Sequence, residues 1–556
     1  MLQSLWFSCA LVFAAVFPQC AAVLVDFQVA QPPPVPQDAQ QCTIQILQRD
    51  FANSFGMAEV VEFTPPTDCG TPGSWAAVTL NFTVTSNGTQ FDRLGIFTFQ
   101  NVEIWRTSTP EPSAAGIIWT YIKDVTRFIP LFAKPGTFIL QLDNLIETGL
   151  NGIYSTTLHA TFYASSPAHP PAKQANTIIP LSTLANDTGN DASVPPSFSI
   201  NVTVPQNAVE IYAELVPSGN GNEEFWYFNI ANEFLNDFPN GTLGQGPFRE
   251  VRLLVDGQVA GVAFPYPVIF TGGILPTAWR PITSYGALDL PTYFLDLTPF
   301  VPLLTDGNPH TFTIDVASAE ADKTILQNWF VSGVLQVITD SSSERTTGNI
   351  TSYSAEPFAV ASTTGSVDAN GDIHITVTAS RQINITAEIV SGSGKRNTVV
   401  VSQTLEYVNQ QDYLDNTLVQ NLFQSSSGSV LSTHNNVPAV VDTFSYPITI
   451  NFTSLNNAGT QFTTTFDHSQ LAGGFFTIAS TGNTGNGTSN NTFSYVDQAG
   501  NTYNRKVDAA LNVITFDEVS GSLSNAPRLP LPLSSTQNAG AFAGARLPPG
   551  RGKLGD

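Results

Sequence analysis

Alternation of apolar and polar residues, in short runs divided by Gly, Pro, Asn and Asp, is the main pattern of this 556-residue chain. A period of two is typical of β-strands that bury one face. The runs lie at 75–85, 94–104, 116–124, 137–145, 153–163, 208–216, 248–255, 293–297 and 310–316, and the pattern returns at 373–377. Only 12% of residues are charged, and the long Ala, Glu, Lys and Leu stretches typical of helices are missing. We therefore expect an all-β protein.

Changes in composition divide the chain into domains. The runs group into a first β-sandwich at 42–165 and a second at 197–340, followed by a β-rich domain at 349–522. Segment 166–196, rich in Pro, Ala, Asn and Ser, is expected to be a linker. The tail at 523–556 has leucine–proline repeats and no core-forming pattern, and is expected to be disordered.

The amino terminus has the features of a signal peptide at 1–22. It carries no charged residue, and its apolar run at 11–17 is far shorter than the ~20 residues of a membrane span. Cys20 and Ala22 supply the small residues expected before a cleavage site. The alternative is an uncleaved anchor, because no basic segment precedes the apolar run. No later segment is apolar enough to span a bilayer, so we expect a secreted protein, extracellular or vacuolar, without stable membrane insertion.

Cysteines and glycosylation motifs agree with secretion. Cleavage after residue 22 leaves Cys42 and Cys69, which we expect to form one disulfide. The chain also has ten Asn-x-Thr sequons, which are candidate glycosylation sites at the surface of a secreted protein. These sequons are at Asn81, Asn87, Asn186, Asn201, Asn240, Asn349, Asn384, Asn451, Asn486 and Asn490.

Charge and motif searches exclude several function classes. The net charge of −23 argues against nucleic acid or an anionic membrane as a partner. The sequence has no Gly-x-Ser-x-Gly elbow, His-Glu-x-x-His, phosphate-binding glycine loop or dinucleotide fingerprint, and its six scattered histidines predict no metal site. What remains is carboxylates: Asp92 with Arg93 where a strand begins, and Glu223 with Glu224 beside three aromatic residues. Paired carboxylates can share acid and base roles in hydrolysis.

The segments around these acids resemble a known family. They are 90–93, 102–112, 118–120, 123–127, 142–145, 222–227, 248–251, 254–257, 265–274, 279–282 and 289–291. In this order they resemble the peptide N-glycosidase A family of plants and fungi, in detail over roughly residues 42–340. The resemblance implies an amidase that cleaves the bond between asparagine and the first N-acetylglucosamine of an N-glycan. Its substrates would be N-glycosylated peptides or denatured glycoproteins, and it would need no cofactor or metal.

The resemblance also suggests an architecture and a role for individual residues. Bacterial amidases of the same activity consist of two adjacent jelly rolls with the site between them, which implies two jelly-roll-like sandwiches here. Their Trp-Asp-Arg triplet is similar to residues 91–93, so Asp92 is the primary catalytic candidate. Glu224 is expected to help protonate the departing nitrogen, and a third bacterial acid corresponds to Asn144, which cannot transfer a proton. The residues expected to bind substrate are Arg93, Trp105, Glu111, Asn144, Glu223, Trp226, Arg249 and Trp279.

Three alternatives stay open from the residues alone. The tryptophans can belong to the core of a β-sandwich instead of a sugar site. A non-catalytic glycan-binding or adhesion protein would have similar β domains, sequons and aromatic residues. A two-carboxylate glycosidase would use the same acids but release free sugar.

Overall fold

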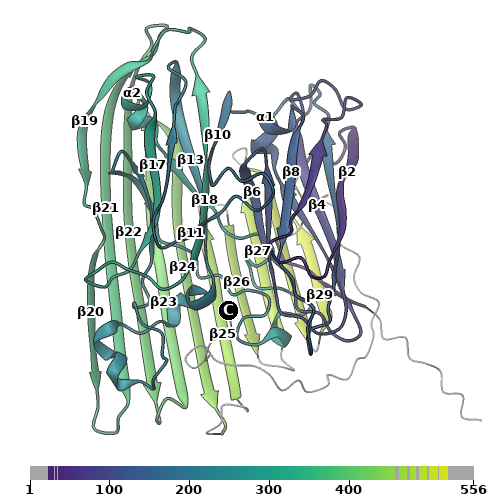
Figure 1. Ribbon diagram of the computed structural model, residues 1–556, viewed down its shortest axis with the longest axis vertical. Helices are drawn as coiled ribbons and strands as arrows, with labels where there is room; N and C mark the ends of the chain where they lie inside the picture. The colour runs from purple at the N-terminus through teal and green to yellow at the C-terminus, as the bar shows by residue number, and fades with distance from the viewer. Residues whose placement is uncertain are drawn as a thin grey trace, which may run out of the picture.

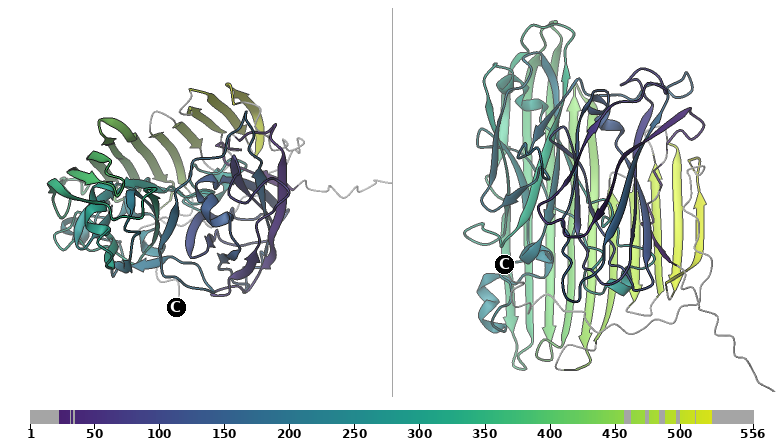
Figure 2. Two further views of the ribbon diagram at one scale, coloured as in Figure 1. Left: turned by 90° about the horizontal axis from the view of Figure 1, so that it is seen from above. Right: turned by 45° about the vertical axis from the view of Figure 1, so that its right-hand side comes forward.

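The computed structural model describes residues 23–523, apart from 31, 34, 457–461, 473–475, 484–487, 497–499 and 511. The described residues form two β-sandwiches that stand side by side, and a large third sheet that runs along one side of both (Figure 1 and Figure 2). The predicted all-β class is confirmed. The predicted signal peptide and the predicted tail from residue 524 onward lie outside the described residues.

In the first sandwich, a sheet of order β1-β7-β4-β9-β2 faces a sheet of order β3-β8-β5-β6. Its elements are β1 (Leu24–Asp26), β2 (Gln41–Phe51), β3 (Glu59–Phe63), β4 (Ala77–Ser86), β5 (Leu94–Phe99), β6 (Val102–Ser108), β7 (Ile117–Asp124), η1 (Thr126–Phe128), α1 (Ile129–Phe132), β8 (Gly136–Leu142) and β9 (Tyr154–Tyr163). All pairs are antiparallel except β1 with β7. Alternate residues such as Ile117, Trp119 and Tyr121 of β7 point into the core between the sheets.

The second sandwich has the same strand order. The sheet β10-β18-β13-β16, with β11 also paired to β18, faces the sheet β12-β17-β14-β15. Its elements are β10 (Thr177–Leu181), β11 (Ala192–Val194), β12 (Phe198–Val202), β13 (Ala208–Gly219), η2 (Gly221–Glu223), η3 (Trp226–Phe228), η4 (Asn232–Asp237), β14 (Glu250–Val255), β15 (Gln258–Ala263), η5 (Pro276–Trp279), β16 (Tyr293–Asp296), η6 (Thr298–Phe300), α2 (Val301–Leu304), β17 (His310–Ala317) and β18 (Trp329–Thr339). By position, β4, β5 and β6 correspond to β13, β14 and β15.

A turn that recurs at the same place supports this correspondence. Asp124 and Thr126 precede α1, and Asp296 and Thr298 precede α2. In each turn the threonine amide donates to Oδ1 of the aspartate, at 2.8 and 2.9 Å respectively. The threonine Oγ1 accepts a bond from a backbone amide of β4 or β13. An aspartate and a threonine therefore hold the turn against the neighbouring strand in the same way in both sandwiches.

The third domain is one antiparallel sheet, in which β22 to β29 follow one another as successive hairpins. Its strands are β19 (Thr347–Ala355), β20 (Val360–Val367), β21 (Ile373–Val390), β22 (Arg396–Leu414), β23 (Val419–His434), β24 (Val437–Ser454), β25 (Phe462–Ala472), β26 (Phe476–Asn483), β27 (Thr488–Val496), β28 (Thr502–Ala510) and β29 (Val513–Ser520). Burial alternates along β21, where Ile375 and Val377 are buried. One hydrophobic core joins this face to the second sandwich, and a smaller one joins Tyr503 and Val507 to Phe27 beside β1.

The third sheet also covers an edge of the second sandwich. Strand β15 lies at the end of its sheet, so part of its backbone has no neighbouring strand. The side chain of Gln403 on β22 takes that place: Oε1 accepts from the amide of Val262 at 3.1 Å, and Nε2 donates to its carbonyl at 3.2 Å.

Several sequence expectations can be compared with the described residues. The run at 94–104 is not one strand but the β5–β6 hairpin, because Gln100 and Asn101 turn the chain with φ of 50° and 64°. The expected linker contains β10 and β11, which pair with β18. Cys42 and Cys69 form the expected disulfide. Within the described part of the chain, no helix has the length and apolarity needed to cross a bilayer.

The sequon asparagines are mostly at the surface. Among the described residues, eight are exposed, at Asn87, Asn186, Asn201, Asn240, Asn349, Asn384, Asn451 and Asn490. Asn81 on β4 is half-buried, and Asn486 lies outside the described residues. The exposed positions meet the steric requirement for a glycan.

Candidate active site

Two carboxylates of the first sandwich converge where it contacts the second. Asp92 lies between β4 and β5, and Glu111 follows β6. The β5–β6 hairpin brings their segments together. The amide of Arg93 donates to Oγ1 of Thr109 at 2.8 Å, and the amide of Thr109 donates to the carbonyl of Arg93 at 2.9 Å. Both carboxylate side chains are half-buried, so solvent and a ligand can reach them.

Gly272 of the second sandwich faces this pair. A Cβ atom placed on Gly272 would lie within 2.6 Å of both Oδ1 of Asp92 and Oε1 of Glu111, so the two oxygens are within about 5 Å of each other. Any side chain at this position would collide with both carboxylates. Glycine is therefore the residue that lets the second sandwich approach the pair this closely.

Hydroxyl groups hold the Gly272 segment in place. Oγ1 of Thr271 donates to the carbonyl of Thr109 at 2.5 Å and lies 2.9 Å from Oγ of Ser108. The amide of Ser108 donates to the carbonyl of Ala287 at 2.7 Å. The end of β6 is thus bonded to two points of the long connection between β15 and β16.

Arg93, directly after Asp92, is held by neutral acceptors. Its Nε donates to Oδ1 of Asn144 at 3.3 Å, and one terminal nitrogen donates to Oε1 of Gln90 at 2.7 Å. Asn144 is fully buried, and its Nδ2 donates to two backbone oxygens at 3.0 Å each. Asn144 therefore orients Arg93 from inside the sandwich, instead of facing a substrate as the resemblance implied.

Tyr154, at the start of β9, is buried in the first sandwich and bonds to the residue that precedes Asp92. Its hydroxyl donates to the carbonyl of Phe91 at 2.7 Å. Burial raises the pKa of the Tyr154 phenol well above its usual value, and the negative charges of Asp92 and Glu111 raise it further. The phenol stays protonated and keeps donating to the residue before Asp92.

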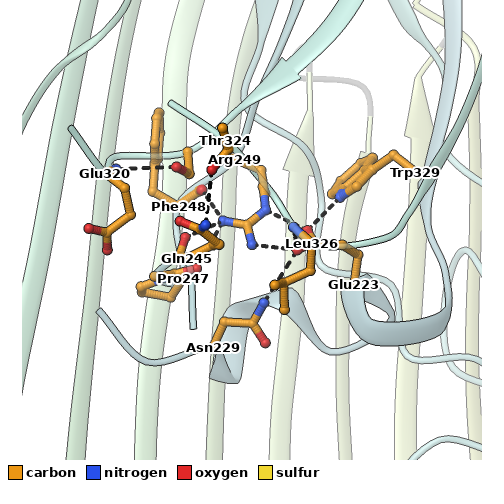
Figure 3. A network of polar contacts seen from close by, with 12 residues as sticks. Glu223, Asn229, Gln245, Pro247, Phe248, Arg249, Glu320, Thr324, Leu326 and Trp329 are labelled. Carbon is orange, nitrogen blue, oxygen red and sulfur yellow. Dashed lines mark hydrogen bonds and ion pairs between the residues drawn. The ribbon is translucent and has the colours of Figure 1, made fainter. Parts of the chain in front are cut away.

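Glu223 and Arg249 form a separate, fully buried ion pair (Figure 3). Nε and a terminal nitrogen of Arg249 donate to the two carboxylate oxygens of Glu223 at 2.5 and 2.8 Å. The carboxylate also accepts from the amide of Leu326 at 2.9 Å and from Nε1 of Trp329 at 2.8 Å. The other terminal nitrogen of Arg249 donates to three backbone carbonyls. Both residues, expected to bind substrate, therefore have their polar groups occupied within the protein.

The remaining candidates are Glu224 and the three tryptophans. Glu224 is half-buried and lines a cavity of about 20 Å³ together with Trp226 and Phe270. Trp105, Trp226 and Trp279 are 2–3% exposed, and Trp105 stacks on Phe97 in the core. These rings offer no open face for a sugar, in agreement with the alternative of a core role.

The structure thus brings together four of the ten candidates: Asp92, Arg93, Glu111 and Asn144. Sequence reasoning missed Gly272 and Tyr154. The pair Gly272-Gly273 was a usable signal, because adjacent glycines in a connection often mark a close backbone approach. Tyr154 had no signal of its own, since its strand shows an ordinary alternating pattern.

Comparisons with known proteins decide the family. The model of the family "Peptide N-acetyl-beta-D-glucosaminyl asparaginase amidase A" matches residues 31–356, which is more than half of the chain. The chain belongs to this amidase A family. The model "PNGase_A C-terminal domain" matches residues 374–448 of the third sheet. The peptide-N4-(N-acetyl-beta-glucosaminyl)asparagine amidase A of Prunus dulcis is 34% identical over 446 residues, which cover 74% of this chain and 76% of that protein. The amidase A match includes both sandwiches apart from β1, and every residue of the carboxylate site.

Proposed function

We propose that this protein is an amidase that hydrolyses the bond between asparagine and the first N-acetylglucosamine of N-glycosylated peptides. Membership of the amidase A family and the relative's name support the reaction. The main structural support for this site is that the carboxylates of Asp92 and Glu111 both lie against Gly272. This pair is half-buried at the contact of two sandwiches, so a glycosylated side chain can reach it.

The two carboxyl groups divide the proton transfers of an amide hydrolysis. Two ionised carboxylates at this distance repel each other, so the pair favours holding one proton. Asp92, as the ionised base, takes a proton from water while the water oxygen attacks the amide carbon. Glu111, as the acid, gives its proton to the amide nitrogen as the carbon–nitrogen bond breaks. Asparagine becomes aspartate, and the sugar leaves as a glycosylamine.

We assign the acid role to Glu111 instead of Glu224. The carboxylates of Glu111 and Asp92 both lie against Gly272, whereas Glu224 lines the small cavity next to Trp226. Arg93 cannot take a proton from water, because a guanidinium stays charged. It offsets part of the negative charge of the pair, and Asn144 keeps it in position.

A defined glycopeptide tests the proposal. The protein is incubated with a peptide that carries one N-glycan, and the released peptide is weighed. Conversion of the glycosylated asparagine to aspartate supports the amidase. A peptide that keeps one sugar indicates a glycosidase, and an unchanged substrate that nevertheless binds indicates a glycan-binding protein.

A glycosidase is the second candidate because of the carboxylate spacing. Retaining glycosidases also act through two close carboxyl groups, about 5–5.5 Å apart, and the contacts of Gly272 limit the distance between Oδ1 of Asp92 and Oε1 of Glu111 to about 5 Å or less. Free reducing sugar in the same assay distinguishes this reaction from the release of a glycosylamine.

We also propose that the protein is secreted. The disulfide between Cys42 and Cys69 and the eight exposed sequons support passage through an oxidising, glycosylating compartment. Expression in a eukaryotic host is expected to give a glycosylated product in the medium with Val23 at its amino terminus. Amino-terminal sequencing checks the cleavage, and retention of the protein in the membrane fraction would contradict it.

A further inference from the structure

The connection that carries Gly272 to the carboxylates has little backbone structure of its own. Residues 264–275 lie in no helix or strand. Within them, the amide of Gly273 donates to the carbonyl of Phe270 at 2.8 Å, and the amide of Leu275 donates to the carbonyl of Gly273 at 2.7 Å. Since these local turns do not tie the segment to a sheet, its position depends on side-chain contacts with neighbouring elements.

One strand of the third sheet supports both ends of this segment. His468 on β25 stacks on Tyr266, with ring centres 4.6 Å apart and planes at 18°, and its Nδ1 lies 3.2 Å from the Tyr266 hydroxyl. Phe466 packs on Trp279 at 5.3 Å, and Nε1 of Trp279 donates to the carbonyl of Gly273 at 2.8 Å. Residues two apart on a strand point to the same face. His468 and Phe466 therefore hold the segment from one side.

Burial keeps both partners of the contact between His468 and Tyr266 uncharged. Burial lowers the pKa of His468 to about 3, against a smaller opposing contribution from the backbone of Pro267. Burial also raises the pKa of Tyr266 well above its usual value. The imidazole is neutral and the phenol is protonated, so the tautomer of His468 decides which of the two groups donates the hydrogen bond. A neutral, fully buried imidazole cannot reach a substrate, and its contact with Tyr266 is the way it can affect the site.

We infer that His468 is a positioning residue for the amidase reaction, and that the third sheet serves the active site by holding segment 265–273 so that Gly272 stays against Asp92 and Glu111. This inference rests on the proposed function, because it takes the carboxylate pair as the reacting groups. The third sheet contributes to the rate without supplying a group that touches the substrate.

A double-mutant cycle tests the role of the bond. Tyr266→Phe and His468→Phe each keep an aromatic ring and remove one partner of the hydrogen bond. We expect each variant to lower kcat by about 10- to 100-fold, because small misplacements of reacting groups have effects of this size, while KM changes little. The double variant should be no worse than either single variant, since both remove the same bond. His374→Asn, on the exposed face of β21 and paired with Asp412, is the matched control and should keep its kcat.

Hydrogen exchange tests the same inference without a substrate. Amides at 268–275 should exchange faster in Tyr266→Phe and in His468→Phe than in the unchanged protein, while the β5–β6 hairpin keeps its protection. This measurement stays informative if glycopeptides prove not to be substrates, so failure of the amidase proposal and failure of the positioning role are distinguishable. Melting temperatures confirm that each variant is folded. Unchanged exchange at 268–275 in a folded His468→Phe protein, together with unchanged kcat where activity is present, would overturn the inference.

Discussion

The two sandwiches carry an arginine at an equivalent position and use it differently. Arg93 directly precedes β5, and Arg249 directly precedes β14, which has the same place in its sheet. Arg249 binds the carboxylate of Glu223 through two hydrogen bonds, and both side chains are fully buried. Arg93 donates to the amide oxygens of Gln90 and Asn144 and is half-buried. The arginine at this position thus binds a buried carboxylate in one sandwich and two neutral amide oxygens in the other.

The difference shows how to tell a structural acid from a reactive one. The Glu223 carboxylate is saturated by Arg249, Trp329 and a backbone amide, so it has nothing left to offer a ligand. Asp92 and Glu111 both lie against Gly272 and are half-buried, so their carboxylates are partly open to solvent. A buried carboxylate whose oxygens are all hydrogen-bonded, like that of Glu223, indicates a structural role. Two partly exposed carboxylates close to each other, like those of Asp92 and Glu111, indicate a catalytic role.

Removal of the Asp92 charge is expected to have the largest effect of the proposed changes, a loss of kcat. Asp92→Asn keeps the shape of the side chain but cannot accept a proton from water, so kcat should fall by about 10³-fold or more. The rate of peptide release measured by mass spectrometry checks this, with the melting temperature as a test of folding. A fully active Asp92→Asn enzyme would exclude this site.

Breaking the buried pair should affect stability instead. Arg249→Met leaves the Glu223 charge buried without a partner, which costs about 3–5 kcal/mol of folding free energy. Urea unfolding measures the loss, and the double variant Glu223→Gln with Arg249→Met should recover a large part of it. If Arg249 bound substrate, the folded fraction of the single variant would show a raised KM, contrary to our expectation.

The two candidates for the second acid give a direct contrast. Glu111→Gln removes the proton donor next to Asp92 and should lower kcat by about 10²-fold. Glu224→Gln, which changes the side chain in the Trp226 cavity, should stay close to the unchanged enzyme. The same glycopeptide assay compares the two, and the reverse ranking would restore Glu224 to the acid role.

The glycine opposite the pair can be tested by adding one carbon atom. The Cβ of Gly272→Ala would overlap Asp92 and Glu111, so the segment or the carboxylates must shift, and kcat should fall by about 10-fold or more. Gly273→Ala is a neighbouring control, because its Cβ would meet Ile269 and the backbone of Phe270 and not the carboxylates. Equal losses in both variants would indicate a general distortion of the connection.

The recurring aspartate turn gives the smallest effect, on pH dependence. Asp296, unlike its counterpart Asp124, is buried and contacts His434 of the third sheet, with Nε2 2.9 Å from Oδ2. Burial alone lowers the pKa of His434, but bonds to Asp296 and Glu210 raise it to about 9. Because folding raises the pKa of His434, its protonation stabilises the folded protein fully at pH values below about 6.5, the usual pKa of histidine. This contribution to stability is lost as the pH rises through 9. After solvent screening we expect a loss of about 1 kcal/mol in urea unfolding between these pH values, and its absence in His434→Asn.

Sequence patterns predicted the features that depend on residues close together in the chain. Alternation along β21 predicted which face is buried, and the resemblance pointed to Asp92. The partner of Asp92 could not be predicted, because the site joins residues near 92, 111 and 272 across a contact of two sandwiches. Whether Trp105 and Trp226 are buried could not be predicted either, because the residues around a tryptophan do not show whether its ring packs in the core or faces a sugar. The β5–β6 turn was missed because Gln100-Asn101 lacks the glycine of the commonest two-residue turns.

The position of β25 near the carboxyl end has a consequence for the biogenesis of the enzyme. A chain made from its amino terminus can fold both sandwiches before residues 466 and 468 exist. The segment that carries Gly272 then lacks its ring contacts with Phe466 and His468. By the time those residues are made, the exposed sequons from Asn87 to Asn451 have all been synthesised. The contacts that we infer to position the active-site segment can therefore form only after these sequons have been made, whereas the exposed sequon at Asn490 follows them in the chain.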